Sequence, residues 1–175
     1  MQSKPIKSMS THFSETLDAI KASANEELAG YETDEISKIE RLYDIIIVGD
    51  FRSFLKLAGK CSGGVIGDRD MILYRRTMTL RSHLLLQTGF RNDLQDLGLF
   101  DIVGMKPFVF SIESETVYYF LSTAAKDSQK VYLLDENNDQ IRETAWNFSD
   151  YIEQQVLAGR KHKSNAICKS DLLLI

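Results

Sequence analysis

Hydrophobic positions in the first third of the chain recur every three or four residues. From Ser10 onward the apolar residues of the first such run are Phe13, Leu17, Ile20, Ala24 and Leu28. This spacing predicts an amphipathic helix that ends at Gly30. Thr33 can cap a second helix, which Gly49 ends. The apolar face of this second helix comprises Ile36, Ile39, Leu42, Tyr43 and Ile46.

A third, shorter helix is predicted between two glycines. Asp50 stands at the N-cap position, and Gly59 stands where a C-terminal stop is expected. The residues of its apolar face are Phe51, Phe54, Leu55 and Ala58. The chain then turns at Gly63 and Gly64, because two glycines permit a positive φ.

The stretch between residues 65 and 97 gives mixed signals. Val65-Ile66 and Met71–Tyr74 predict two short strands around a charged turn at residues 67–70. The apolar spacing of residues 77–97 favours a helix that is interrupted near Gly89.

Runs of β-branched and aromatic residues predict four strands in the second half of the chain. These runs are Phe108–Ile112, Thr116–Leu121, Lys130–Leu134 and Gln140–Thr144. Turn-forming residues separate them, so we expect an antiparallel meander with a hairpin turn at residues 135–139. Asn147 can cap a last helix that ends at Gly159, with Asp150 at its third position and a hydrophobic staple between Trp146 and Tyr151. Helices, then strands, then a closing helix predict one α+β domain.

Length and composition agree with a single globular domain. The chain has 175 residues, of which 43% are hydrophobic and 26% are charged, and its net charge is −4. We expect a flexible leader at residues 1–9, one domain at residues 10–159, and a basic and apolar tail at residues 160–175, either packed on the domain or frayed. The acidic balance disfavours direct nucleic-acid binding and suits a basic protein partner.

The sequence also predicts a cytoplasmic protein. Cys61 and Cys168 lie far apart, show no metal-type spacing and form no disulfide framework, which favours a reducing compartment. The N-terminal residues lack the apolar core of a signal peptide. The longest apolar runs are too short to span a membrane.

Two stretches invite a ligand-binding interpretation. Gly59–Gly64 contains Lys60 and three glycines, as a phosphate loop would, but these glycines follow a helix instead of opening one, which favours a structural turn. Residues 135–139 carry Asp and Asn at alternate positions, as a calcium loop does. Gln140 replaces the required glycine, and a hairpin turn is favoured.

Carboxylates and histidines give no enzyme signature. The pairs Asp68/Asp70 and Glu113/Glu115 would each place two acids on one face of a strand, which suits acid–base work, a metal, a solvated surface or a basic partner. The three histidines are isolated from one another, at positions 12, 83 and 162. We expect no catalytic residues, no metal and no cofactor.

Residues 39–156 resemble the SUKH superfamily, which includes bacterial immunity proteins and a fungal cell-wall regulator. The matching segments are IERLYDIIIVGDFRSFLKLAGKCSGG, KPFVFSIESETVYYFLST, KVYLLDENNDQI and TAWNFSDYIEQQV. Two positions depart from the family pattern. Gly49 occupies the place of the usual proline, and Glu113-Ser114-Glu115 replaces the usual glycine-aspartate pair between the two middle strands.

The resemblance implies a fold and a function. The implied fold is a twisted, largely antiparallel sheet of about four to six strands with helices packed against it. The implied function is non-catalytic: an immunity protein that binds a cognate toxin domain, often a nuclease, and blocks it. A regulatory interaction scaffold without a toxin partner and a small enzyme with a dispersed site are the alternatives. The residues expected to contact a basic partner are Asp68, Asp70, Glu113, Glu115, Glu136 and Asp139.

Overall fold

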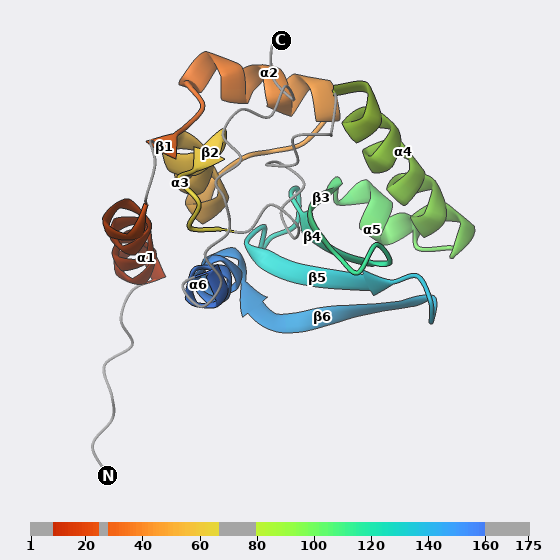
Figure 1. Ribbon diagram of the computed structural model, residues 1–175. Helices are drawn as coiled ribbons and strands as arrows, with labels where there is room; N and C mark the ends of the chain where they lie inside the picture. Colours follow the sequence, from red (N-terminus) through yellow and green to blue (C-terminus); the bar gives the residue numbers. More distant parts are fainter. Residues whose placement is uncertain (1–8, 25–27, 67–79, 160–175) are drawn as a thin grey trace.

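A four-stranded antiparallel sheet lies at the centre of the computed structural model (Figure 1), which describes residues 9–24, 28–66 and 80–159. Its strands follow one another as a meander in the order β3-β4-β5-β6. Their bounds are Pro107–Glu113 for β3, Val117–Ser122 for β4, Lys130–Asp135 for β5 and Gln140–Asn147 for β6. The predicted α+β class and the antiparallel meander are confirmed.

Both faces of this sheet are covered, because successive side chains of each strand point to opposite sides. In β3, for example, Phe108 and Phe110 pack on one face and Val109 packs on the other, and all three are buried. The helices therefore form two layers with the sheet between them.

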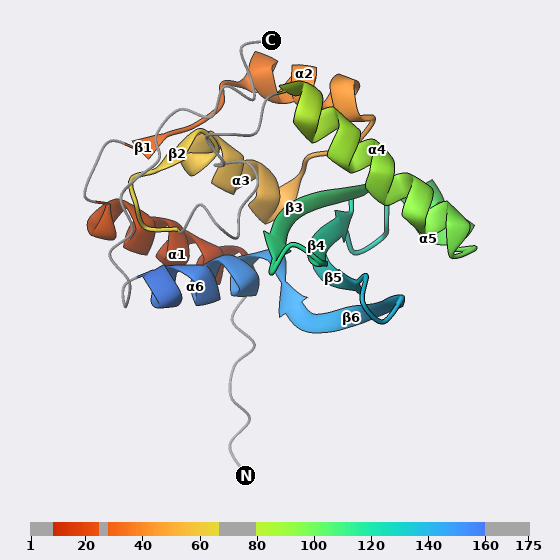
Figure 2. The ribbon, with the colours of Figure 1, turned by 45° about the vertical axis from the view of Figure 1, so that its right-hand side comes forward.

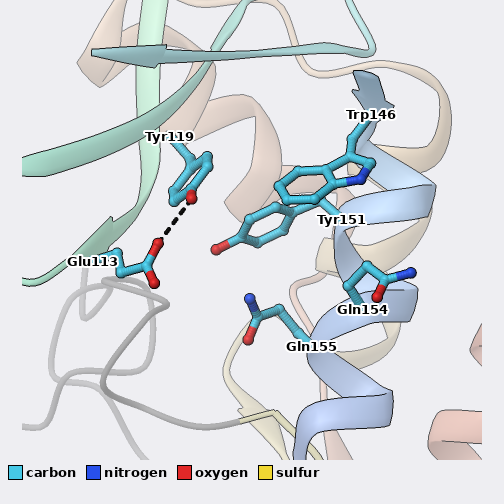
Figure 3. Close-up of a pocket in the computed structure, with 6 residues that line it drawn as sticks. All are labelled: Glu113, Tyr119, Trp146, Tyr151, Gln154 and Gln155. Atoms are coloured by element: carbon cyan, nitrogen blue, oxygen red, sulfur yellow. Dashed lines mark hydrogen bonds between the residues drawn. The ribbon is translucent and has the colours of Figure 1, made fainter. Parts of the chain in front are cut away.

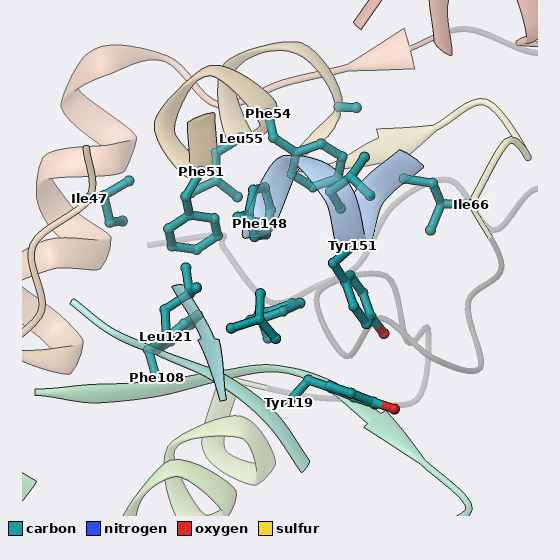
Figure 4. Close-up of a cluster of buried hydrophobic side chains, with 14 of the residues drawn as sticks. Ile47, Phe51, Phe54, Leu55, Ile66, Phe108, Tyr119, Leu121, Phe148 and Tyr151 are labelled. Atoms are coloured by element: carbon teal, nitrogen blue, oxygen red, sulfur yellow. The ribbon is translucent and has the colours of Figure 1, made fainter. Parts of the chain in front are cut away.

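Helices α1 (Met9–Ser23), α2 (Thr33–Tyr43), α3 (Gly49–Ala58) and α6 (Phe148–Gly159) supply the cover of the first face. Helices α1 and α6 lie side by side, and α3 contacts both (Figure 2). Phe148, the first residue of α6, is fully buried between α3 and the sheet (Figure 4). The second face is covered by α4 (Leu80–Asp96) and α5 (Phe100–Gly104), through side chains such as Phe90 and Leu94.

The first helix ends earlier than predicted. It stops at Ser23, and Leu28–Ala29 forms a short strand, β1, that pairs with β2 (Cys61–Ser62). Gly30 is needed there for close approach, because a Cβ at this position would lie 1.7 Å from the backbone oxygen of Lys56. The glycine therefore serves packing against the end of α3, and the prediction of a helix stop at this residue was wrong.

The boundary between α2 and α3 also differs from the prediction. Glu32, not Thr33, is the N-cap of α2, and the helix ends at Tyr43 with Asp44 in the left-handed region. The backbone at the start of α3 is capped from the β4–β5 loop, where Gln129 Oε1 accepts the N–H of Phe51 at 3.2 Å. Asp50 therefore lies inside the first turn of α3 and is not its cap.

Three further predictions were wrong, and three others lie wholly or mostly outside the described residues. Val65 and Ile66 are buried but belong to a turn, not to a strand. Helix α4 continues without interruption through Gly89, where added side-chain atoms would meet open space. Cys61 is buried and disulfide-bonded, in contrast to the expected absence of a disulfide. The strand predicted at Met71–Tyr74, most of the leader and the whole tail fall outside the described residues.

The closing helix was predicted well. Asp150 Oδ2 accepts the N–H of Asn147 at 2.9 Å, which is one half of a capping box. The rings of Trp146 and Tyr151 contact each other at a centroid distance of 6.1 Å, as the predicted staple requires.

The edge strand β3 is held by one side chain of α4. The side-chain amide of Gln87, which is 3% exposed, donates from Nε2 to the oxygen of Val109 at 2.7 Å. Its Oε1 accepts the N–H of the same residue at 3.0 Å. Because no strand of the described part of the chain pairs with β3 on this side, Gln87 takes the place of one and satisfies two buried backbone groups.

We predict that Gln87→Leu lowers the free energy of unfolding by about 2–4 kcal/mol, since it leaves two buried backbone groups without partners. Urea unfolding measures the change. Thr88→Ala, on the exposed side of the same helix, is the control and should change the stability little. A loss no larger for Gln87→Leu than for the control would contradict this role of the amide.

His83 is a second buried polar group on α4. Its side chain is 1% exposed, and its Nδ1 lies 2.6 Å from the hydroxyl of Tyr43. Its Nε2 has no hydrogen-bond partner among the described residues. Burial lowers the pKa of His83 from 6.5 to about 4. The unfolded chain therefore binds a proton in this pH range that the folded protein does not bind.

We predict that this difference destabilises the fold as the pH falls from 6.5 towards 4, by up to about 3 kcal/mol. His83→Gln removes the titrating ring and should show a shallower loss of stability over the same range. Urea unfolding of both proteins between these pH values measures the two slopes. Equal slopes would show that the histidine does not contribute.

Candidate functional site

Two hairpin turns meet at one end of the central sheet. They connect β3 to β4 (residues 114–116) and β5 to β6 (residues 136–139). The N–H of Glu136 donates to the oxygen of Thr116 at 3.0 Å, and the amide of Asn137 donates to Thr116 Oγ1 at 2.9 Å. Four exposed carboxylates lie on these turns or beside them, and we call them the acidic end: Glu113, Glu115, Glu136 and Asp139.

The sheet register explains why residues so distant in sequence meet. Glu113 pairs with Val117, Val117 pairs with Asp135, and Asp135 pairs with Gln140. These paired residues form one row across the sheet, so both turns begin at the same end of it. The structure thus brings together four of the six acids that the sequence analysis selected, whereas Asp68 and Asp70 lie outside the described residues.

The local geometry of the turns corrects one prediction and confirms another. Glu113 ends β3 but Glu115 lies in the turn, so these two acids do not share one face of a strand. Asp135 accepts hydrogen bonds from the N–H of Asn137 at 3.0 Å and from Nδ2 of Asn138 at 2.7 Å. These contacts close a hairpin turn, as predicted for residues 135–139.

Negative charge at this end extends to the second helical layer. Burial raises the pKa of Tyr118 to about 12, helped by a hydrogen bond to Glu136 and by the charges of Glu136 and Asp93. Asp93 belongs to α4, so a helix adds a carboxylate beside the two hairpins. The acidic end is therefore a region of negative potential built from both strands and a helix.

A small aromatic cleft lies beside the acidic end, between the sheet and α6 (Figure 3). Its volume is about 150 Å³. We call this hollow the aromatic cleft. It is lined by Glu113, Tyr119, Trp146, Tyr151, Gln154 and Gln155. A second hollow of about 310 Å³ adjoins it across Tyr119 and Trp146 and extends over Leu133 to residues 142–145 of β6.

Hydrogen bonds hold the tyrosines of this cleft in place. The hydroxyl of Tyr119 donates to Glu113 Oε2 at 2.8 Å, and the hydroxyls of Tyr151 and Ser111 lie 2.7 Å apart. The ring of Tyr119 lies 5.0 Å from that of Tyr151 and 6.4 Å from that of Trp146. The cleft therefore has rigid aromatic walls and one carboxylate, Glu113, that also belongs to the acidic end.

No sequence pattern indicated this cleft. Trp146 and Tyr151 were predicted to form a helix staple, and nothing in the spacing of Tyr119, Gln154 or Gln155 marked them as a site. The cleft needs β3, β4, β6 and α6 in their final positions, and no sequence spacing encodes that arrangement. The one available signal was the run of three aromatic residues at positions 146, 148 and 151.

Other candidate residues have structural roles. The ammonium group of Lys60, considered for a phosphate loop, pairs with Glu35 at 2.7 Å and lies 5.1 Å from the ring centre of Tyr31. Gly63 and Gly64 have positive φ, which agrees with the favoured turn. Within the described ranges, no group of three His, Cys, Asp or Glu side chains could hold a metal ion.

Comparison with known proteins gives the family. The model of the SUKH_6 family, described as SMI1-KNR4 cell-wall, matches residues 33–152, which is more than two-thirds of the chain. The chain belongs to this family. No curated protein and no solved structure gave a significant match.

Family membership places the site in context. The SUKH match covers the strands of both hairpins and the first turn of α6, and therefore includes every residue of the acidic end. SUKH proteins are generally non-catalytic and act in immunity or regulation through protein–protein interaction. Among the described residues, no helix is long and apolar enough to cross a membrane.

We predict that Glu115→Gly stabilises the protein by up to about 1 kcal/mol. Glu115 has a φ of 66°, a region that favours glycine, so the substitution relieves backbone strain that outweighs the added freedom of the unfolded chain. Thermal unfolding measures the change. Glu136→Gly is the control, because Glu136 is also exposed but does not have a positive φ. This substitution should not raise the stability of the protein. A loss of stability in Glu115→Gly would refute the strain.

Proposed function

We propose that this protein is a non-catalytic immunity protein that binds and neutralises a cognate bacterial toxin, of the nuclease type, by covering its active site or substrate surface. The observation that carries the proposal is the acidic end. The chain belongs to a family of proteins that act through protein–protein interaction. Its fold brings four exposed carboxylates from two separate hairpins together beside a rigid aromatic cleft.

The charge of the acidic end suits a basic partner. Nucleases that bind the phosphate backbone present positive surfaces, and complementary fields accelerate the association of two proteins. The acids of the two turns contribute to such a field, and Asp93 adds to it. We include Asp68 and Asp70 in the proposed contact set on the basis of sequence alone.

The aromatic cleft would contribute binding affinity, whereas the charges of the acidic end would raise the association rate. Binding energy at protein interfaces concentrates in a few residues, and tyrosine, tryptophan and arginine are enriched among them. Trp146 is partly exposed at the cleft and backed by Tyr119 and Tyr151, so it presents a rigid apolar contact. The acidic end and the cleft together form one contiguous candidate interface through Glu113.

A regulatory interaction scaffold is the second candidate, and the cell-wall description of the matching family model favours it. The two functions differ in their partner. A gene for a large secreted protein with a toxin domain next to this gene supports immunity. Co-expression decides: rescue of cells from that toxin, with a complex on size exclusion, is expected, and continued killing without a complex would refute the immunity function.

We predict that the double substitution Glu136→Gln and Asp139→Asn slows association with the toxin several-fold at low salt. Neutral amides retain the shape of the turn but remove two charges, and the effect should shrink at high salt as screening increases. Surface plasmon resonance at several salt concentrations measures the association rate.

The matched control removes two exposed carboxylates from helices on the opposite side of the molecule from the β5–β6 turn (Figure 1), by Asp18→Asn on α1 and Asp34→Asn at the start of α2. It changes the net charge by the same amount and should alter the association rate much less. Equal effects of both double variants would show that overall charge, and not the acidic end, guides the partner.

A further inference from the structure

The aromatic cleft presents one charge inside a set of aromatic and amide groups. Among the described residues, six line the cleft; Glu113 is the charged one of these six, and the others are two tyrosines, a tryptophan and two glutamines. The neighbouring hollow differs, because Arg142 also lines it and its carboxylate, Glu143, pairs with the ammonium group of Lys130 at 3.0 Å. As far as the described residues show, a cation would therefore meet a carboxylate without a cationic partner in the smaller cleft and not in the larger hollow.

The carboxylate is held in position. Glu113 Oε2 accepts the hydroxyl of Tyr119 at 2.8 Å, and Tyr119 itself is only 7% exposed. A carboxylate has about four acceptor positions, so this single bond leaves most of them for a ligand. Figure 3 shows Glu113 on one side of the cleft and the amides of Gln154 and Gln155 on the helical side. The site thus has acceptors on two sides and aromatic rings between them.

We infer that this cleft binds the guanidinium group of an arginine side chain from the protein partner. A guanidinium group is planar, stacks on aromatic rings and donates two parallel hydrogen bonds to a carboxylate. Its five N–H donors match the carboxylate of Glu113 and the side-chain oxygens of Gln154 and Gln155. A lysine ammonium group is compact and strongly hydrated, and it cannot use the ring faces and the carboxylate in this way.

This inference rests on the proposed function, because the arginine belongs to the bound partner. It adds the kind of side chain that anchors the complex. Surfaces that bind phosphate backbones are rich in arginine, so a toxin of the nuclease type offers such side chains at the surface that must be blocked. The acidic end attracts the basic surface, and the aromatic cleft holds one arginine from it.

The test uses the fluorescence of Trp146, which is the single tryptophan of the chain. Glycyl-arginyl-glycine, blocked at both ends, is titrated into the full-length protein, alongside the same peptide with citrulline or with lysine. Citrulline has the size of arginine but no charge. We expect a saturable change in emission with the arginine peptide, and about tenfold weaker binding of the other two.

Substitutions in the protein locate the effect. Glu113→Gln keeps an acceptor for Tyr119 but removes the charge, and it should weaken binding of the arginine peptide about tenfold. Asp18→Asn, which neutralises an exposed acid of α1 that belongs neither to the cleft nor to the acidic end, is the matched control and should bind as the wild type does. Should Glu113→Gln fail to fold, the double variant Gln154→Ala and Gln155→Ala tests the helical side of the cleft, and weaker binding is expected.

The outcomes separate this inference from the proposed function. Equal binding of the arginine and citrulline peptides, no saturable binding, or no effect of substitutions in the cleft would overturn the arginine site. If the toxin still binds the wild-type protein in that case, the immunity function stands without it. Arginine binding by a protein that forms no complex with the toxin would instead overturn the immunity function and leave the site in place.

Discussion

The packing of Phe148 is the interaction on which the rest of the structure depends. Its ring is fully buried and contacts Phe13 of α1, Phe51 and Phe54 of α3 and Phe110 of β3, at centroid distances between 5.1 and 6.4 Å. One side chain therefore joins two helices and the edge strand of the sheet. Such aromatic contacts add to the hydrophobic energy of burial, and replacement of a buried phenylalanine by alanine commonly costs about 3–5 kcal/mol.

The position of Phe148 also places the candidate interface. Strand β6 runs directly into α6 at this residue, so the buried ring sets where the helix starts and which of its residues face the sheet. One turn later Tyr151 meets Tyr119, and a further turn brings Gln154 and Gln155 to the edge of the cleft. The core and the proposed binding surface therefore share one helix. This arrangement suits a binding protein, because rigid anchors lose little conformational entropy when a partner binds.

Local patterns in the sequence predicted most elements of the fold. Strands were found because their β-branched and aromatic runs are separated by turn residues, and α6 was found from Asn147 and Asp150. The errors occurred where distant contacts override local signals. Gly30 suggested a helix stop, yet it serves close packing against Lys56, and Ile46 extended the period of α2 although the chain leaves the helix at Asp44. The spacing of hydrophobic residues along the chain cannot show where a distant segment will contact the backbone and end a helix.

The sequence by itself determined the family, the α+β class, the meander and the acids of the two hairpin turns, because each depends on residues close together in the chain. Only the tertiary structure decided that Glu113 and Glu136 lie at the same end of the sheet, since this depends on the register between strands. It alone revealed the aromatic cleft as well. Tyr119 and Gln155 are far apart along the chain, and they meet only because the burial of Phe148 draws α6 across the sheet.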